Sequence, residues 1–214
     1  MYLILHAYIF FMKKLPLSFY ARKEVVQIAR DLLDKIVVSR VGGELVSGRI
    51  VETEAYVGLS DKASHSFGGR RTARNEHMYS AAGTVYVYIC YGIHQMLNVV
   101  TNEAGVPDAV LIRALEPIDG ITVMLKRTGK KIPDFTLTKG PGNVGKALGI
   151  SRAQSGLMFV DELLAIYEDD ESSLASHMAG ISSRIGVESA GPDALLPYRF
   201  YIKGNKYVSG KPVK

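Results

Sequence analysis

Cysteine is almost absent from this 214-residue sequence, since Cys90 is the one cysteine. A chain with one cysteine has no internal disulfide framework and no cysteine-rich zinc site. This scarcity is typical of a reducing compartment, so we expect a cytoplasmic location. The five histidines supply no familiar ligand spacing either, so the sequence predicts no metal site.

The sequence also lacks a hydrophobic run long enough to span a bilayer. Its opening stretch, MYLILHAYIFFM, is apolar but shorter than the roughly 20 residues that a membrane helix needs. No positive segment precedes it and no small-residue cleavage site follows it, so it does not read as a signal peptide. We interpret residues 1–14 as an apolar extension, with a buried strand as the alternative, and residues 15–214 as one domain.

Charge of one sign is only moderately in excess. The 26 Lys and Arg outnumber the 21 Asp and Glu by five, without a long charged block. This balance permits a polyanionic partner without requiring one. A hydrophobic content of 47% is ample for a packed core, so we expect a globular protein that is not held in a membrane.

Helical spacing of apolar residues occurs in three places, which are 22–35, 119–129 and a segment from about Val144. Residues 57–75 are different, because they are rich in glycine, serine and charge and lack any period. Structureless loops of this length are uncommon in compact domains, so we expect this one to be functional.

Strand-like segments dominate the rest of the chain. Residues 35–57 are β-branched and turn at Gly42-Gly43, which predicts a strand, a hairpin turn and a longer strand that ends near Tyr56. Further strands are predicted over 84–90, 95–101 and 109–117, the last closed by Pro117, with a final hairpin over 198–210. The fold class is therefore α+β, a single mixed α/β domain with a curved, mainly antiparallel sheet.

Strand geometry places Glu52, Glu54 and Tyr56 on one face of the second strand. This face could be solvated, since exposed glutamate is common. Alternatively, a carboxylate beside aromatic surface and a second carboxylate can serve as a general base that takes a proton from water. Glu54 is nearer to the long loop than Glu52, so it is the better candidate.

The stretch GTVYVYICYGIHQMLNVV, residues 83–100, carries an aromatic alternation that breaks at Tyr91. Tyr86 and Tyr88 are expected on one strand face, with aliphatic side chains on the core face. Tyr91 precedes Gly92, where the chain must turn, so its ring is predicted to project from a hairpin tip. An exposed ring in a basic protein can fill the gap left by a displaced base. Core packing is the alternative for the two strand tyrosines, and we favour it for Tyr86.

Several polar residues stand where ligand contacts are plausible. His65 lies in the small-residue context SHSFGG and, with Tyr56 and Tyr88, could hold a flat ring between π faces, although a single histidine is more often structural. Asn98 lies among apolar residues and needs a partner if buried. Arg113 has the same need, which a carboxylate such as Glu116 or an external anion could meet.

Candidate contacts to a nucleic-acid backbone are weaker. Arg70, Arg71 and Arg74 lie in the long loop, where ordinary surface charge is an equal alternative. Lys139 precedes a glycine-rich helix start, KGPGN, which could bind phosphate, although such connections are often only turns.

Six ordered blocks resemble the alkyladenine (3-methyladenine) DNA glycosylase family in its bacterial form. The blocks are GRIVETEAYVG, DKASHSFGGRRTARNEHMY, GTVYVYICYGIHQMLNVV, VLIRALEP, KGPGNVGKALGI and RIGV with LPYRFYIKGN. They keep the family's internal spacing from about Leu15 almost to the end, which is far more specific than any one motif. Residues 1–11 match nothing in the pattern and 160–180 are variable, so neither contributes to the functional prediction.

The resemblance implies a monofunctional enzyme that flips alkylated or deaminated purines out of double-stranded DNA. It would hydrolyse the N-glycosidic bond and so initiate base excision repair. Glu54 falls at the position that activates the attacking water, and Arg113 falls at an arginine near that water and the DNA backbone. Tyr91 falls at the intercalating position of a protruding β-hairpin. The positions implied for the base pocket are Tyr56, His65, Tyr88 and Asn98, the last of which excludes normal guanine.

The resemblance further implies no metal or organic cofactor, and we expect a monomer associated with the nucleoid through DNA binding. Two alternatives remain open. One is a non-catalytic module that binds structured nucleic acid, although an acidic Glu54 in a DNA groove would cost affinity. The other is a lyase with a Schiff-base lysine, although no lysine is adjacent to Glu54 and Tyr56 in the sequence.

Overall fold

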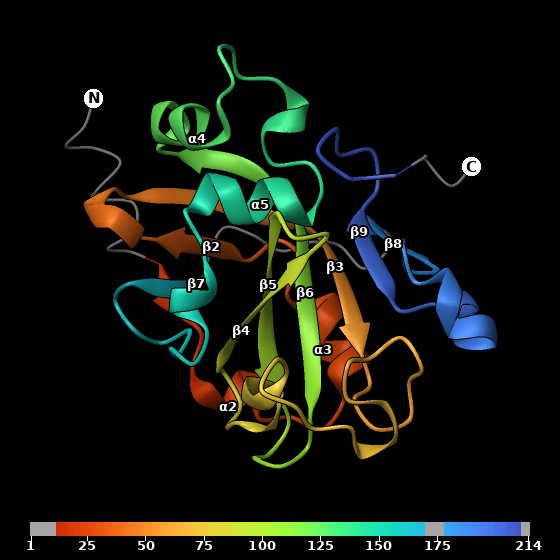
Figure 1. Cartoon of the computed structure of the whole chain (residues 1–214). Coiled ribbons are helices and arrows are strands. Elements are labelled where there is room, and N and C mark those ends of the chain that lie inside the picture. The colour runs from red at the N-terminus through yellow and green to blue at the C-terminus, as the bar shows by residue number, and fades with distance from the viewer. Residues whose placement is uncertain (1–11, 170–177, 211–214) are drawn as a thin grey trace.

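The computed structural model describes residues 12–169 and 178–210 (Figure 1). Their strands are β1 (Lys13–Lys14), β2 (Ile36–Ser39), β3 (Val46–Tyr56), β4 (Val85–Cys90), β5 (His94–Thr101), β6 (Asp108–Asp119), β7 (Leu164–Glu168), β8 (Ala179–Ser182) and β9 (Arg199–Ile202). The α-helices are α2 (Leu17–Tyr20), α3 (Val25–Asp31), α4 (Ile121–Thr128) and α5 (Pro141–Leu148). Short 3₁₀ turns are Val41–Gly43, Phe67–Gly69, Glu76–Tyr79, Phe135–Leu137, Arg152–Gln154 and Glu188–Leu195.

The strands form one antiparallel sheet in the order β1-β7-β2-β3-β6-β5-β4, with β9 on β3 and β8 on β9. β3 is the central strand, because β2 pairs with it up to Arg49 and β9 pairs with it from Glu52. Its register with β6 is irregular between Ile50 and Thr53, and such irregularities bend a strand. The expected fold class, a mixed α/β domain with a curved antiparallel sheet, is confirmed.

The two faces of β4, β5 and β6 have different roles. Val87, Leu97 and Ile112 point into the main apolar cluster, which also holds the buried side chains of α3 and α5. The alternate residues Tyr86, Asn98 and Leu111 point to the opposite face, where they line a pocket. The core therefore fixes the strands from one side and leaves the other side for the site.

Most predicted elements are present, but three of them have corrected boundaries. β6 runs through Pro117, which pairs with Gly48 beside a register shift, where the missing N–H of proline is tolerated. α5 begins at Pro141 instead of Val144, because proline is well suited to the first helical position. The predicted helix over 22–35 is shortened to α3. The segment after α3 turns at Asp34, which has a φ of +71°.

The predicted final hairpin over 198–210 is wrong. Only β9 is a strand, and its partners are β3 and β8. Residues 203–210 instead form turns that bring Ser209 back to Glu52 on β3. Sequence periodicity cannot show this pairing, because β9 meets β3 and β8 only when the chain is folded.

The apolar N-terminal segment lies mostly outside the described residues. Its last two residues, Lys13 and Lys14, form β1 and pair with β7 at the sheet edge. Within the described ranges, no helix has the length and apolar content needed to cross a membrane.

Candidate active site

A pocket of about 720 Å³ opens on the polar face of β4, β5 and β6. The long loop 57–75 and the segment that follows β8 complete its walls. Its volume lies in the range of small-molecule sites. The four residues expected in a base pocket all line it: Tyr56, His65, Tyr88 and Asn98.

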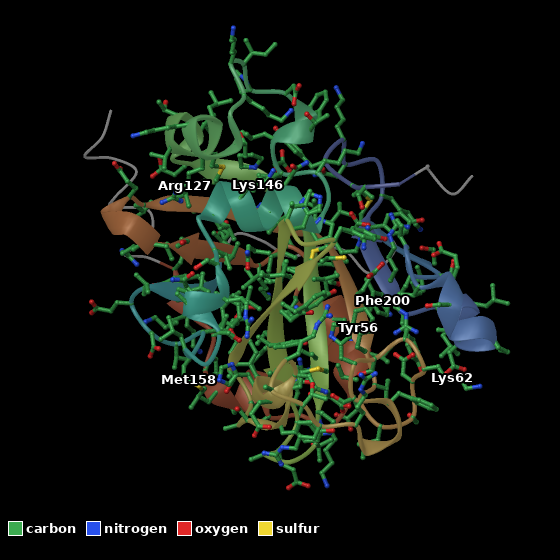
Figure 2. The ribbon with its side chains drawn as sticks, viewed as in Figure 1. Tyr56, Lys62, Arg127, Lys146, Met158 and Phe200 are labelled. Carbon is green, nitrogen blue, oxygen red and sulfur yellow. The ribbon has the colours of Figure 1, made fainter. Side chains whose placement is uncertain are left out.

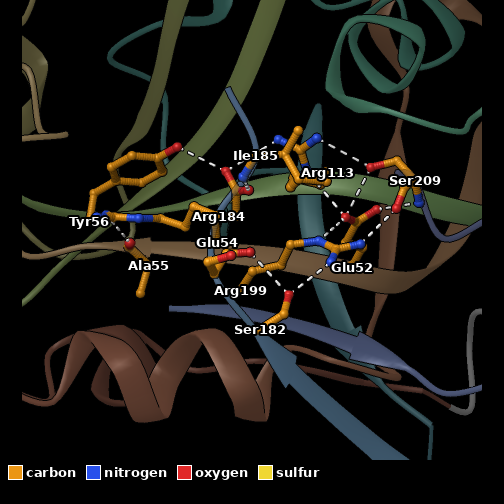
Figure 3. A network of polar contacts seen from close by, with 11 residues as sticks. Glu52, Glu54, Ala55, Tyr56, Arg113, Ser182, Arg184, Ile185, Arg199 and Ser209 are labelled. Carbon is orange, nitrogen blue, oxygen red and sulfur yellow. Dashed lines mark hydrogen bonds and ion pairs between the residues drawn. The ribbon is translucent and has the colours of Figure 1, made fainter. Parts of the chain in front are cut away.

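Glu54 is fully buried, and polar contacts hold its carboxylate from several sides (Figure 3). Its Oε1 accepts a hydrogen bond of 2.8 Å from the backbone N–H of Ile185. Its Oε2 accepts from the Tyr56 hydroxyl at 2.8 Å and lies 3.2 Å from Arg113 Nη1. Tyr56, Arg113 and Ile185 themselves line the pocket, so every partner of this carboxylate reaches the cavity.

Glu52 anchors the other side of the same network and is also fully buried. Its Oε1 lies 3.2 Å from Arg113 Nε and 2.6 Å from Arg199 Nε, and accepts from the Ser209 hydroxyl at 2.9 Å. Its Oε2 accepts from the Ser209 backbone N–H at 2.7 Å. The face shared by Glu52 and Glu54 is therefore buried, and the solvated alternative is wrong.

Arg113 pairs with Glu52 and Glu54, and its expected partner Glu116 is occupied elsewhere. Glu116 Oε2 accepts from the Asn205 side chain at 2.8 Å. Burial opposes the charge of Arg113, but the carboxylates of Glu54 and Glu52 prevail and raise its pKa. The guanidinium thus separates two buried carboxylates and gives each of them a cation.

The hydroxyl of Tyr56 is held protonated beside Glu54. Burial raises the pKa of Tyr56 well above its ordinary value, and the neighbouring Glu54 carboxylate raises it further. The phenol therefore acts only as a hydrogen-bond donor to Glu54 in the working pH range.

The opposite pocket wall is aromatic. The rings of His65 and Tyr88 meet edge to face with centroids 4.6 Å apart, and those of Tyr86 and Tyr88 lie 5.6 Å apart. Tyr86 packs against Met78 in a buried cluster, as favoured from the sequence. Tyr86 also has a second role that sequence analysis missed. Its hydroxyl lies 2.9 Å from His65 Nδ1, and its side chain lines the pocket.

We expect the His65 imidazole to stay neutral down to about pH 4. Burial lowers its pKa from 6.5 to about 4, and Arg74 and Arg70 act in the same direction. The unfolded chain takes up this proton near pH 6.5, so the free energy of unfolding falls as the pH drops from 6.5 towards 4, by at most about 3 kcal/mol. NMR titration of the ring protons measures the pKa directly. A midpoint near 6.5 would contradict this prediction, and His65→Gln should remove the acid-side loss of stability.

Asn98 is buried at the pocket floor, and its side-chain amide has the partners that its position requires. Nδ2 donates to the carbonyl oxygens of Met96 at 3.0 Å and Tyr86 at 3.2 Å. These bonds to two strands fix the orientation of the amide beside the cavity.

Tyr91 projects from the turn between β4 and β5. Its backbone has a φ of +50°, a conformation uncommon for residues other than glycine, and 86% of the residue is exposed. The turn is closed by a hydrogen bond from Ile93 N to Cys90 O. The break in alternation at Tyr91 thus turns its ring out of the strand pattern, at the rim of the pocket.

The basic residues of the long loop have different surroundings. Arg70 and Arg74 line the pocket, and the Arg74 guanidinium lies 5.6 Å from the Tyr88 ring centre and donates to Ile89 O. Arg71 instead forms an exposed ion pair with Glu76, so its guanidinium is less available to bind an external anion. Outside the loop, Lys139 Nζ donates to the carbonyl oxygen of Lys206 at 3.3 Å.

Arg184 is a site residue that sequence analysis missed. It forms a buried ion pair with Asp61 of the long loop, donates to Ala55 O at 2.9 Å, and places its guanidinium 4.8 Å from the Tyr56 ring centre. It therefore ties the loop to β3 behind Tyr56. The sequence carried no spacing signal for this pair, because the partners stand 123 positions apart.

In the described part of the chain, no group of three or more His, Cys, Asp or Glu is arranged to hold a metal ion.

Comparison with known families finds that the model described as Methylpurine-DNA glycosylase matches residues 18–206. A protein of Desulfitobacterium hafniense named "Putative 3-methyladenine DNA glycosylase" is 42% identical over 207 residues, which cover 94% of this chain and all of that protein. Proteins with the same name from Clostridium acetobutylicum and Bacillus subtilis are 43% and 41% identical over 92% and 91% of this chain, and over 97% and 96% of their own lengths.

Proposed function

This chain belongs to the methylpurine-DNA glycosylase family, and we propose that it excises alkylated or deaminated purines that it flips out of duplex DNA. It is a hydrolase that acts on N-glycosyl bonds in DNA. The proposal depends above all on one observation. A pocket lined by Tyr56, His65 and Tyr88 lies directly in front of a buried carboxylate, Glu54.

We assign to Glu54 the activation of the attacking water. The glycosidic bond breaks through a cationic sugar, so a carboxylate on the sugar side can stabilise the developing charge and also take a proton from water. The water oxygen forms the new bond to C1′ while the base leaves with the electron pair of the old bond. A purine that is already positively charged by alkylation leaves as a neutral base.

Arg113 supports this role of Glu54 in two ways. Its Nη1 contact fixes the Glu54 carboxylate, and its Nε contact ties it to the deeper anchor Glu52. Because Arg113 also lines the pocket, the same guanidinium lies within reach of a water or a DNA phosphate at the reaction centre.

The aromatic walls favour flat and electron-poor bases. A cationic alkylated purine between Tyr56 and Tyr88 gains cation–π attraction of about one to two kcal/mol when desolvated. The lowered pKa of His65 supports this preference, because it keeps the imidazole neutral. A neutral ring does not repel a cationic base and still offers a nitrogen for a hydrogen bond. Hypoxanthine is neutral and gains less from this attraction. We propose that Asn98 excludes normal guanine by crowding its 2-amino group.

Around the pocket, we propose that Arg70, Arg74 and Lys139 contact the DNA backbone, with Arg71 a weaker candidate because Glu76 already pairs with it. The partner is then double-stranded DNA that contains a damaged purine, bound by a monomer. Excision would leave an abasic site and initiate base excision repair.

We expect Tyr91→Ala to slow base release from fully paired duplex by roughly tenfold to a hundredfold, the range of a lost aromatic–base stack. The ring would fill the gap that the flipped nucleotide leaves. Because Tyr91 is exposed, the melting temperature should not change. Ile93→Ala is the matched control, since it also removes an exposed apolar side chain at the tip. Equal losses in both variants would contradict a specific wedge role for Tyr91.

The proposed function is tested by incubating the native protein with duplexes that carry 3-methyladenine or hypoxanthine. We expect free base and an intact strand with an abasic site. Binding without release would favour the non-catalytic module. Strand cleavage with a borohydride-trapped adduct would favour the lyase, for which folding offers Lys62 on the pocket wall. Release of 3-methyladenine alone would restrict the proposal to alkylated purines.

A further inference from the structure

The positive charge of this protein is concentrated away from the loop arginines. Residues 120–149 and 203–206 contain eight of the chain's 26 Lys and Arg but one of its 21 Asp and Glu, which gives a net charge of +7. The rest of the chain has 18 basic and 20 acidic residues and sums to −2. The moderate overall charge thus conceals a strongly basic region.

Two segments of this region lie side by side, the connection between α4 and α5 and the turn after β9 (Figure 1). The Phe135 and Tyr207 rings meet edge to face with centroids 5.4 Å apart, and Lys206 Nζ lies 5.1 Å from the Phe135 ring centre. Lys139 joins the segments through its bond to Lys206 O. We call this the lysine–aromatic surface, defined by Lys130, Lys131, Phe135, Lys139, Lys206 and Tyr207.

Within the described ranges, most cations of the lysine–aromatic surface have no acidic partner. Lys130 lies 3.5 Å from Asp134, but no acidic side chain among the described residues pairs with Lys131, Lys139 or Lys206. Lys131 and Lys206 are exposed, and Phe135 remains 46% exposed. Basic residues in the region also serve the fold. Arg127, labelled in Figure 2, donates to the backbone oxygens of Val41 and Ala147. Lys139 has a similar task, because it donates to the backbone oxygen of Lys206, whereas the ammonium groups of Lys131 and Lys206 make no such bond within the described residues.

The lysine–aromatic surface is continuous with the pocket. Pro141, the first residue of α5, lines the pocket and follows Lys139 by two positions. The next residue, Gly142, packs on the hairpin so closely that a Cβ there would stand 2.5 Å from His94 Nδ1. The first turn of α5 therefore lies between the hairpin and the lysine–aromatic surface.

We propose that the lysine–aromatic surface binds the sugar–phosphate backbone of the duplex on one side of the lesion. This inference rests on the proposed function and extends its footprint beyond the flipped nucleotide. Unpaired lysines release counterions when they meet phosphates, and such contacts position a protein on DNA without reading sequence. Because the surface lies on one side of the hairpin, it reaches only one of the two DNA arms.

The test compares Lys131→Ala/Lys206→Ala with the native protein on duplexes that carry a lesion. The duplex arm on one side of the lesion is about half a helical turn long, and the arm on the other side is about one turn or longer. A second duplex has the short and the long arm on the opposite sides. We expect the double variant to bind roughly ten- to thirtyfold more weakly at physiological salt and its salt slope to fall by about two. The loss should appear only when one particular arm is long.

The control is Lys13→Ala/Lys23→Ala, which removes the same charge from an exposed lysine on β1 and another in the segment between α2 and α3. Helix α2 lies at the other end of the molecule from α4 (Figure 1). It should leave the dependence on arm length unchanged. An unaltered salt slope, or equal losses with both arm arrangements, would overturn the proposal. So would an unchanged affinity for duplex combined with lost binding to anionic lipid vesicles. Binding is read without chemistry, so the result stands even if the native protein releases no base.

Discussion

Glu54→Gln is expected to reduce single-turnover base release by about a thousandfold or more while duplex binding persists. A general base contributes roughly two to four orders of magnitude, and the same carboxylate would also stabilise the cationic sugar. The substitution keeps the size of the side chain but removes its charge. Rapid-quench measurement with excess enzyme isolates the chemical step from binding.

Stability must be followed in the same variant. Glu54 accepts hydrogen bonds from Ile185 N and the Tyr56 hydroxyl and forms an ion pair with Arg113. The side-chain amide of a glutamine at this position cannot satisfy all three donors. We expect a loss of about 1–3 kcal/mol in the free energy of unfolding. Glu116→Gln is the matched control, because it alters a carboxylate on β6 that contacts Asn205 outside the pocket. Near-native release by a folded Glu54→Gln protein would exclude Glu54 as the base.

Arg113→Met is expected to destabilise the protein by about 3–5 kcal/mol, since it leaves buried carboxylates with less compensation. Glu52 and Glu54 carry two negative charges in this network, balanced by Arg113 and Arg199. Removing Arg113 takes away the cation that contacts the Glu54 carboxylate directly and leaves it only the weaker electrostatic interaction with Arg184. For a chain of this length, the expected fall in melting temperature is about 6–20 °C, which calorimetry can measure.

Arg113→Lys separates charge from geometry. Lysine keeps the positive charge but lacks the planar fork that reaches Glu52 through Nε and Glu54 through Nη1. We expect it to recover part of the stability and little of the base release, because Glu54 loses its fixed orientation. If Arg113→Met unfolds at the same temperature as the native protein, the buried network does not carry the stability assigned to it here.

The parts of the site that strand alternation could predict lie within one strand or at the turn that ends it. The period of two placed Glu52, Glu54 and Tyr56 on one face, and the hydrogen bond between Glu54 and Tyr56 shows that these two side chains do meet. The displaced aromatic at Tyr91 likewise marked the turn where the ring leaves the strand. In each case, the deciding geometry is local and repeats along a few residues.

The parts that sequence could not predict depend on contacts between distant segments. Arg113 on β6 pairs with Glu52 and Glu54 of the neighbouring strand β3, and not with Glu116, the partner expected from the sequence. Ile185 N and Ser209 N reach their carboxylates across 131 and 157 positions. The basic surface was hidden for the same reason, because its lysines come from two segments that meet only in the fold.

The most direct test is a crystal structure of Glu54→Gln bound to duplex DNA that contains a hypoxanthine lesion. We predict that the purine leaves the helix and lies in the pocket against Tyr56, His65 and Tyr88, with C1′ facing residue 54 and Tyr91 in the vacated stack. A lesion that remains stacked in the helix, with DNA bound on another face, would contradict the assignment of this pocket as the active site.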